Sequence, residues 1–422
     1  MARWIYSLLM YLALPAVFVF FWLRGRRDPA YRRGWAQRLG YADNAIPAGC
    51  LLVHAASVGE VIAATPVIQR LAARYPDLPL VVTTMTPTGA ERVHAAFGER
   101  VHHSYLPLDV PHAARRFLSR LKPSVCVIME TEVWPNLVNA CARNGVPVVL
   151  ANARMSARSE RGYMRFGFFA RPLFGTLDWV AAQAEPDAAR FRNLGVAPER
   201  LAVTGSIKYD VSIDEATRSR AAGLQGEIGA RPVWIAASTH EGEDEQVLDA
   251  HARVLERYPQ ALLIVAPRHR ERFDPVCSQI WKRGMSVARR SLGESPEWVS
   301  VYLADTIGEL LMLFGAAGIA FMGGSLIERG GHNPLEAAAW GLPILTGRQV
   351  FNFTTVFQRL SDEGGVNWVD NSADLAQALM TLFGDDESRQ RMGAQASAVV
   401  EANRGAVERL VDGIARLRDQ GC

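Results

Sequence analysis

Three charged side chains in the first half of the chain follow apolar, strand-like runs: Glu60, Glu130 and Lys208. Glu60 ends HAASVGE (54–60) and lies in the first turn of a predicted helix, where the helix dipole helps to keep a carboxylate ionised. An ionised carboxylate at the edge of a ligand cleft can accept a proton from a hydroxyl as a general base. A favourable first-turn residue without a chemical role has the same signature, so the residue types alone leave both interpretations open.

Glu130 and Lys208 are the other two candidates in this half. Glu130 and Glu132 follow the run VCVIM (125–129) and point the same way if the segment stays extended. Glu130 is placed to hold Lys208 or an acceptor, or alternatively only to cap the next helix. Lys208, in TGSIKYD (204–210), is placed to face a phosphate or a sugar carboxylate, although a solvated surface lysine is the plainer interpretation.

The second half has basic and glycine-rich candidates at strand ends. Arg268 and His269 follow a buried run in VAPRHRERF, and a guanidinium matches phosphate oxygens well. A basic strand end without function is an equal alternative. TIGEL (306–310) places Gly308, Glu309 and Leu310 at the opening of a predicted helix over 309–315, where free backbone N–H groups can face a base or a phosphate.

The segment MGGSLIERGGHNPLEAAAWGLP (322–343) carries the strongest local signal. Its two glycine pairs allow the backbone to approach a ligand closely. The motif that follows has the form of a capping box, with proline at the first helical position: Asn333, Pro334, Leu335 and Glu336. Glu336 is then placed to accept hydrogen bonds from ribose hydroxyls. A well-capped helix after a glycine-rich loop, without ligand, is the alternative.

These residues need a scaffold, and the alternation of apolar runs and amphipathic stretches predicts one. The first half predicts helices over 61–75, 87–97, 111–121 and 135–144 between strand-like runs, which is typical of a parallel sheet covered on both faces. The pattern restarts near residue 233. We therefore predict an α/β protein with two Rossmann-like doubly wound domains, at 25–206 and 231–422, joined by a linker at 207–230. A cleft outside the carboxyl ends of both sheets is the expected ligand site.

An uncharged stretch of twenty residues, 4–23, precedes these domains. About 20 apolar residues in a helix cross the roughly 30 Å hydrocarbon core of a bilayer, so we predict a membrane anchor over 1–24. Arginines cluster directly after it: Arg24, Arg26, Arg27, Arg32, Arg33 and Arg38. The positive-inside rule then leaves both domains in the cytoplasm, facing an anionic membrane surface. A cleaved signal peptide and an interfacial helix are the alternatives. The aromatic stretch 165–174 is either membrane-contacting or a core helix.

Composition excludes several classes of protein. The formal net charge of +3 is too small for a protein that coats nucleic acid, and the five cysteines form no C-x-x-C pair or zinc-like spacing, which favours a reducing compartment. The sequence has no D-x-D pair at a strand end, no P-loop and no G-x-G-x-x-G after its first strand. These absences argue against a bound divalent metal, a nucleotide hydrolase and a dinucleotide oxidoreductase.

Taken in order, the motifs resemble the Kdo (3-deoxy-D-manno-octulosonic acid) transferases of lipopolysaccharide synthesis. The match comprises the anchor with RGW at 33–35, HAASVGE, METEVWPN, GSIKYD, APRH, MGGSL, GGHNPLEAAAWG and NF at 352–353. The resemblance implies a GT-B fold and an inverting, metal-independent transfer of Kdo from CMP-Kdo to the lipid A precursor lipid IVA at the inner membrane.

Residue roles follow from the same resemblance, motif by motif. It implies Glu60 as general base and Glu130 with Lys208 as transition-state stabilisers. The CMP contacts that it implies are Arg268, His269, Gly308, Glu309, Leu310, Asn333, Pro334, Leu335 and Glu336. Another membrane-associated GT-B enzyme that uses a UDP-sugar and a lipid-linked acceptor is the main alternative. Two further alternatives are a sugar-nucleotide epimerase, which would not need the membrane anchor, and a non-catalytic nucleotide-binding protein, which would not need Glu60.

Overall fold

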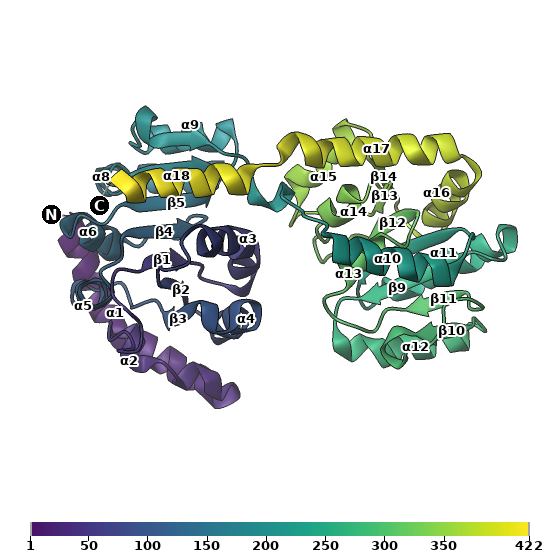
Figure 1. Cartoon of the computed structure of the whole chain (residues 1–422), viewed down its shortest axis with the longest axis horizontal. Coiled ribbons are helices and arrows are strands. Elements are labelled where there is room, and N and C mark those ends of the chain that lie inside the picture. The colour runs from purple at the N-terminus through teal and green to yellow at the C-terminus, as the bar shows by residue number, and fades with distance from the viewer. Residues whose placement is uncertain (1, 421–422) are drawn as a thin grey trace. The chain divides into compact units, whose positions relative to one another are not determined.

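The computed structural model describes residues 2–420, which form two compact units. The first unit runs to Asp210 and takes up the chain again from Arg404, and the second comprises Val211–Asn403. Each unit is a parallel sheet with helices on both faces (Figure 1). The predicted fold class, two doubly wound α/β domains, is confirmed.

The sheet of the first unit has seven parallel strands in the order β3-β2-β1-β4-β5-β6-β7. Most of these strands are buried along their whole length, as expected of a sheet covered on both sides. Their bounds are β1 (Leu51–His54), β2 (Leu80–Thr84), β3 (His102–Tyr105), β4 (Val125–Met129), β5 (Val148–Ala153), β6 (Trp179–Ala182) and β7 (Leu201–Val203).

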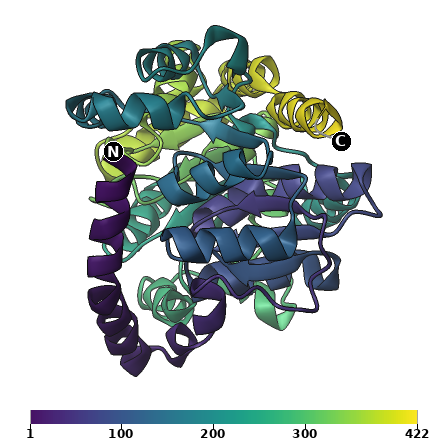
Figure 2. The same ribbon diagram turned by 90° about the vertical axis from the view of Figure 1, so that its left-hand side faces the viewer.

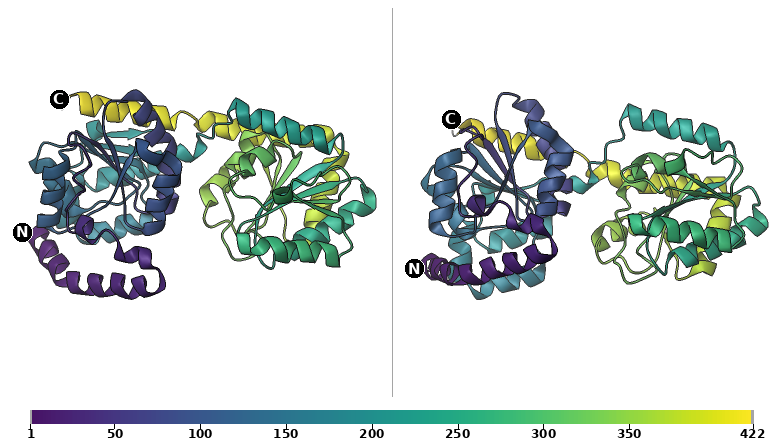
Figure 3. Two further views of the ribbon diagram at one scale, coloured as in Figure 1. Left: turned by 60° about the horizontal axis from the view of Figure 1, so that its bottom comes forward. Right: turned by 90° about the horizontal axis from the view of Figure 1, so that it is seen from below.

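Helices pack on both faces of this sheet (Figure 3). One apolar layer includes Val67 of α3 and Leu410 of α18, and the opposite layer includes Phe117 of α5 and Phe174 of α8. The helices of the unit are α1 (Ala2–Arg27), α2 (Trp35–Arg38), α3 (Val58–Arg74), α4 (Pro87–Phe97), α5 (Pro111–Leu121), α6 (Pro135–Arg143), α7 (Ala157–Arg165), α8 (Gly167–Phe174), α9 (Glu185–Asn193) and α18 (Ala406–Gln420), with 3-10 turns η1 (Pro29–Arg32), η2 (Gly98–Arg100), η3 (Pro198–Arg200) and η4 (Ile207–Tyr209).

The last helix, α18, belongs to the first unit although it ends the chain. The Asp210 carboxylate accepts hydrogen bonds from the backbone N–H groups of Gly405 (2.6 Å) and Val407 (2.5 Å), and so holds the start of α18. The observed units therefore differ from the sequence-based boundaries. Residues 207–210 stay with the first unit, the segment 215–228 is a helix of the second, and 406–420 returns to the first.

The second unit repeats the arrangement, with strand order β10-β11-β9-β8-β12-β13-β14. Its strands are β8 (Val233–Thr239), β9 (Leu262–Pro267), β10 (Val287–Arg289), β11 (Val301–Leu303), β12 (Ile319–Met322), β13 (Ile344–Thr346) and β14 (Val366–Trp368). Its helices are α10 (Glu215–Ile228), α11 (Asp244–Arg257), α12 (Phe273–Lys282), α13 (Leu310–Phe314), α14 (Leu335–Ala339), α15 (Thr354–Asp362), α16 (Ser372–Gly384) and α17 (Asp386–Asn403), with turns η5 (Arg270–Arg272) and η6 (Arg290–Leu292).

Helix α1 lies along the flank of the first unit (Figure 2). Residues 3–26 of it are long and apolar enough to cross a membrane, by length and composition. One face packs on the protein: Tyr6 stacks on Phe169 of α8 at 5.8 Å, and near the other end Phe18 stacks on Trp35 at 5.0 Å. The RGW motif thus supplies, through Trp35, the surface that holds the end of α1.

Candidate active site

Both sheets have a point where the strand order reverses, and the candidate residues gather there. In the first unit the reversal lies between β1 and β4, which are paired in parallel, with His54 opposite Ile128. Glu60 follows β1 and Glu130 follows β4. Ligands of open α/β sheets bind at this position, outside the carboxyl ends of the strands. The structure therefore brings these two predicted residues together.

Local hydrogen bonds fix the Glu60 carboxylate at the start of α3. Ser57, the N-cap of α3, donates from Oγ to Glu60 Oε1 at 3.1 Å, and the backbone N–H of Ala56 donates to Oε2 at 2.8 Å. The S-x-x-E sequence of 57–60 is a capping box, which explains why this turn forms. Both carboxylate oxygens are held, so the side chain is oriented rather than mobile.

The surroundings of Glu60 tune its proton affinity. Burial raises the pKa of this carboxyl from 4.5 to about 7, and the negative charges of Glu130 and Glu132 push the pKa in the same direction against the hydrogen bonds from Ala56 and Ser57. Glu60 keeps part of its surface exposed. A half-buried carboxyl whose pKa lies near neutral pH is suited to general-base catalysis.

Glu130 adopts an unusual backbone conformation. Its φ of +57° is in the left-handed region, which non-glycine residues rarely occupy, and its N–H continues the sheet by donating to Ala151 O at 2.8 Å. Asn152, at the carboxyl end of the neighbouring β5, has a φ of +52°. Strained backbone of this kind is concentrated at functional sites. Asn152 was missed by sequence reasoning, because a left-handed conformation has no signature in a buried strand.

Asn152 also connects this edge to the segment that carries Lys208. Its Oδ1 accepts a hydrogen bond from the N–H of Ile207 at 3.3 Å, where η4 begins. The turn η4 packs on α3, the helix that begins beside Glu60. Lys208, on η4, is therefore placed on the same side of the first unit as Glu60 and Glu130.

The corresponding reversal in the second unit lies between β8 and β12, with Ala237 opposite Met322. The glycine-rich loop after β12 is held by a carboxylate that the sequence analysis did not single out. The buried Glu243 accepts hydrogen bonds from the N–H groups of Gly324 (2.6 Å), Ser325 (3.0 Å) and Leu326 (3.0 Å). Because Glu243 precedes α11 and lies far from this loop in sequence, only the fold reveals the pairing.

A cluster of histidines lies beside this loop. His240, after β8, has its Nε2 2.8 Å from Nε2 of His332, and its ring centroid 5.3 Å from that of His269. Burial, together with the charges of His269, Arg329 and Arg268, lowers the pKa of His240 to about 4. His240 is thus neutral at pH 7, while exposed Arg268 remains available for an anion. His240 and His332 were not among the predicted site residues.

The predicted cap at Asn333 differs in detail from the structure. Asn333 Oδ1 accepts from the N–H of Leu335 at 3.2 Å, and α14 is a helix of only five residues that begins at Leu335 after Pro334. The predicted capping box with proline at the first helical position is therefore wrong in register, because Pro334 is the N-cap of α14 and Asn333 lies one residue before it. Burial raises the pKa of Glu336, whose carboxyl has no hydrogen bond or ion pair among residues 2–420.

The turn at Gly308 exists as predicted, with a φ of +90°, and α13 begins at Leu310. The Glu309 side chain is already engaged, because Arg290 donates to both of its oxygens at 2.6 and 2.7 Å. This ion pair and the Thr306 hydroxyl lower the pKa of Glu309 to about 2. Any ligand contact of 308–310 must therefore use the backbone or Leu310.

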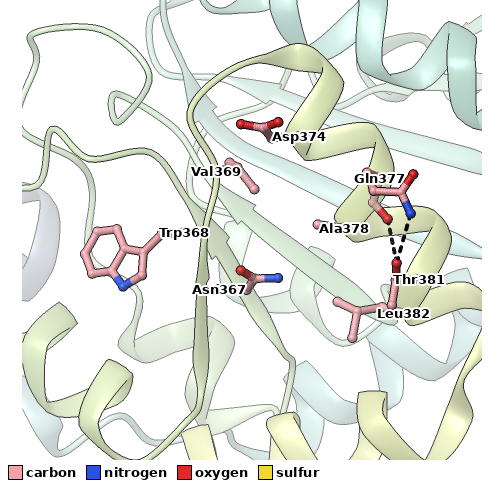
Figure 4. A pocket seen from close by; sticks show the side chains of 8 residues that line it. All are labelled: Asn367, Trp368, Val369, Asp374, Gln377, Ala378, Thr381 and Leu382. Carbon is pink, nitrogen blue, oxygen red and sulfur yellow. Dashed lines mark hydrogen bonds between the residues drawn. The ribbon is translucent and has the colours of Figure 1, made fainter.

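A cavity of about 290 Å³ opens elsewhere in the second unit, between β14 and α16 (Figure 4). Its one carboxylate, Asp374, accepts from the N–H of Asp370 at 3.3 Å and thus serves the start of α16. None of the predicted site residues lines this cavity. Across the described part of the chain, no group of three His, Cys, Asp or Glu side chains is arranged to hold a metal ion.

Comparison with known proteins agrees with this arrangement. Residues 33–211 match the family described as "3-Deoxy-D-manno-octulosonic-acid transferase (kdotransferase)". The 3-deoxy-D-manno-octulosonic acid transferase of Haemophilus influenzae is 42% identical over 98% of both chains, and that of Bordetella pertussis is 35% identical over 98% of this chain and 99% of its own. The crystal structure of Acinetobacter baumannii MurG covers 88% of this chain and 100% of its own with a TM-score of 0.55 at 15% identity, which shows the fold alone.

Two doubly wound units of this kind form the GT-B fold. With the full-length relatives, the assignment becomes specific: this chain belongs to the 3-deoxy-D-manno-octulosonic acid transferase family and is a Kdo transferase. The family resemblance found in the motifs is confirmed.

Proposed function

We propose that the protein transfers Kdo from CMP-Kdo to the lipid A precursor lipid IVA, with inversion at the anomeric carbon. The observation that carries the proposal is Glu60 at the β1–β4 reversal point, held by two hydrogen bonds and with a pKa of about 7. A base with this pKa is about half ionised at neutral pH and can take a proton from a sugar hydroxyl.

The proposed step balances without a covalent enzyme intermediate. Glu60 takes the proton of the acceptor hydroxyl, the acceptor oxygen forms a bond to the anomeric carbon of Kdo, and the bond from that carbon to the phosphate oxygen breaks. CMP leaves with the bonding electrons. Lys208 stabilises the negative charge that develops on the departing phosphate. Glu130, whose own position is fixed by its strained backbone, orients Lys208.

In this proposal the second unit binds the CMP part of the donor. Arg268 supplies a guanidinium for the phosphate, and His269, next to His240, supplies a ring N–H. The Glu336 carboxyl has no partner among residues 2–420 and is placed to accept from ribose hydroxyls, and the turn 308–310 contributes backbone N–H groups. CMP leaves as a monophosphate, so these groups suffice in the proposal without a metal ion.

We further propose that α1 attaches the protein to the cytoplasmic face of the inner membrane, beside its lipid acceptor. The helix leaves a broad apolar face exposed: Trp4, Ile5, Leu8, Leu9, Leu12, Val19, Phe20, Trp22 and Leu23. Phe166 and Phe168, at and after the end of α7, are also exposed, whereas Phe174 of α8 is buried. The other face of α1 packs on the first unit along its length. We therefore propose that α1 lies in the membrane surface with only its exposed face embedded, and does not cross the bilayer as a separate helix.

The test is transfer from CMP-Kdo to a radiolabelled tetraacylated lipid A precursor, with and without a chelator, for the wild type and Glu60→Gln. If a slower-migrating lipid forms in the presence of chelator and is absent with the variant, the result supports CMP-Kdo as donor, transfer without a metal ion, and Glu60 as the base. Transfer from a UDP-sugar, with none from CMP-Kdo, would refute the proposed donor.

A further inference from the structure

A second cavity, of about 600 Å³, lies between α1, α5 and α6. Its walls carry three arginines, one from each helix: Arg3, Arg115 and Arg143. Glu60, Glu130 and Lys208 do not line it, so it is separate from the candidate active site. The volume falls within the range of small-molecule sites in proteins.

The positive charge of this cavity is compensated only at Arg3, where the buried Asp109 lies within electrostatic range. No carboxylate lines it, and neither Arg115 nor Arg143 forms an ion pair or hydrogen bond with another residue in 2–420. Both side chains belong to exposed positions, and Arg143 lies within electrostatic range of Arg3. Arg143 repels Arg3, and an anion bound between the arginines of the cavity relieves that repulsion.

A rigid polar floor lies beneath the arginines. Asn136 is 1% exposed, and its Nδ2 donates to Asp109 O at 2.7 Å, which turns its Oδ1 toward α1. Ser7 Oγ donates to that Oδ1 at 2.9 Å, and Arg3 Nη1 approaches it at 3.4 Å. Asp109, the nearby acid, is already bound to the N–H groups of Asn136 and Leu137. The floor is thus built in advance, and no side-chain rearrangement is needed to form it.

The rim of the cavity is apolar where it meets the exposed face of α1. Trp4 and Leu8 line it and are 69% and 60% exposed. They continue into the apolar face by which we propose that α1 enters the membrane. A ligand with an anionic end and an apolar end would place the first among the arginines and the second along α1. This combination is typical of a membrane lipid and not of a free ion.

We propose that this cavity binds the phosphate headgroup of an anionic glycerophospholipid of the surrounding bilayer, which docks α1 and the first unit on the membrane. The inference rests on the membrane attachment proposed above. Each guanidinium near an anionic membrane contributes on the order of 1 kcal/mol, so two arginines account for about a tenfold or larger change in affinity.

The experiment is native mass spectrometry of the detergent-solubilised full chain titrated with phosphatidylglycerol or phosphatidylcholine. We expect one phosphatidylglycerol to be retained at lower lipid concentration than phosphatidylcholine. Arg115→Gln with Arg143→Gln should weaken phosphatidylglycerol retention about tenfold or more. Ser119→Trp narrows the cavity from an exposed position of α5 without changing charge, and should also weaken it.

The matched control is Arg92→Gln with Arg100→Gln, which removes two exposed arginines of the same unit that lie outside the cavity and have no ion pair within residues 2–420. If both double variants weaken phosphatidylglycerol retention equally, the lipid is held only by the general positive charge of the protein, and the proposal is overturned. Displacement of the lipid by an equal concentration of inorganic phosphate would overturn the lipid as the occupant. A parallel loss of Kdo transfer to detergent-dispersed acceptor in the Arg115/Arg143 variant would assign the cavity to the acceptor instead.

Vesicle co-sedimentation separates the two proposals. If the wild type binds neither neutral nor anionic vesicles yet retains phosphatidylglycerol in detergent, membrane attachment and docking both fail and only the headgroup site stands. If the wild type and the Arg115/Arg143 variant bind vesicles with the same dependence on phosphatidylglycerol, attachment stands and the lipid site fails.

Discussion

Ser57 and Glu60 exchange hydrogen bonds at the start of α3: Ser57 Oγ donates to Glu60 Oε1 at 3.1 Å, and the N–H of Glu60 donates to Ser57 Oγ at 3.4 Å. The capping box at the start of α3 therefore includes the proposed catalytic base. Rotation of the Glu60 side chain would break the hydrogen bonds from Ala56 and Ser57 to its carboxylate, which favours the observed orientation of the base.

Glu60→Gln removes the proton acceptor while it keeps the size of the side chain. We expect Kdo transfer to fall by about 10²- to 10⁴-fold, the usual contribution of a positioned general base. Steady-state transfer assays measure this, and donor binding should be unchanged. Glu408→Gln, at an exposed surface pair with Arg70, is the control and should keep wild-type activity. Activity within a few-fold of wild type in Glu60→Gln would exclude Glu60 as the base.

The rate should depend on pH through Glu60. Only the ionised form accepts a proton, and its pKa is about 7, so transfer should be full above that pH and fall about tenfold per unit below it. Glu132→Gln removes a negative charge that raises this pKa, so the acid limb of the pH profile should move to lower pH. An acid limb that stays in place, or moves to higher pH, would contradict the proposed charge coupling.

Two of the helices that begin with proline were predictable to the residue. The sequence predicted 87–97 and 111–121, and α4 and α5 have these bounds, because proline fixes the first helical position and lacks the N–H that would go unpaired there. Both sheets followed from the alternation of buried runs and amphipathic stretches. For the same reason, the candidates at the strand ends could be located before the fold was known.

Contacts between distant segments were not predictable. Glu243 binds N–H groups 81 to 83 residues away, and Asp210 holds the start of α18 across 195 residues. The left-handed conformation of Glu130 belongs to its place at the carboxyl end of β4 and is not a preference of glutamate. Short α14 replaced a predicted capped helix, because local capping preference is weak beside the packing of the glycine-rich loop.

Glu243→Gln should loosen the glycine-rich loop. The carboxylate of Glu243 accepts from the N–H groups of Gly324, Ser325 and Leu326 with two oxygens, whereas an amide has only one. The NH₂ of the glutamine would face at least one of these N–H groups, so the buried network loses at least one hydrogen bond. We expect the free energy of unfolding to fall by about 2–3 kcal/mol, measured by denaturant titration. Glu245→Gln, on the neighbouring α11, is the comparison, and an equal effect of both changes would contradict the special role of Glu243.

Gly330→Ala tests whether the loop after β12 binds the donor. Gly330 has a φ of +90°, and an added Cβ would lie 2.4 Å from Nδ2 of Asn352, the side chain whose Nδ2 donates to Arg329 O at 2.9 Å. The substitution strains the backbone by about 1–2 kcal/mol and displaces Asn352 of the NF motif, so the loop should shift. We expect the KM for CMP-Kdo to rise about tenfold while the KM for the lipid acceptor stays constant. Gly226→Ala, on α10 with open space around it, should leave both constants unchanged and slightly stabilise the protein. A rise in the acceptor KM alone would move this loop from the donor site to the acceptor site.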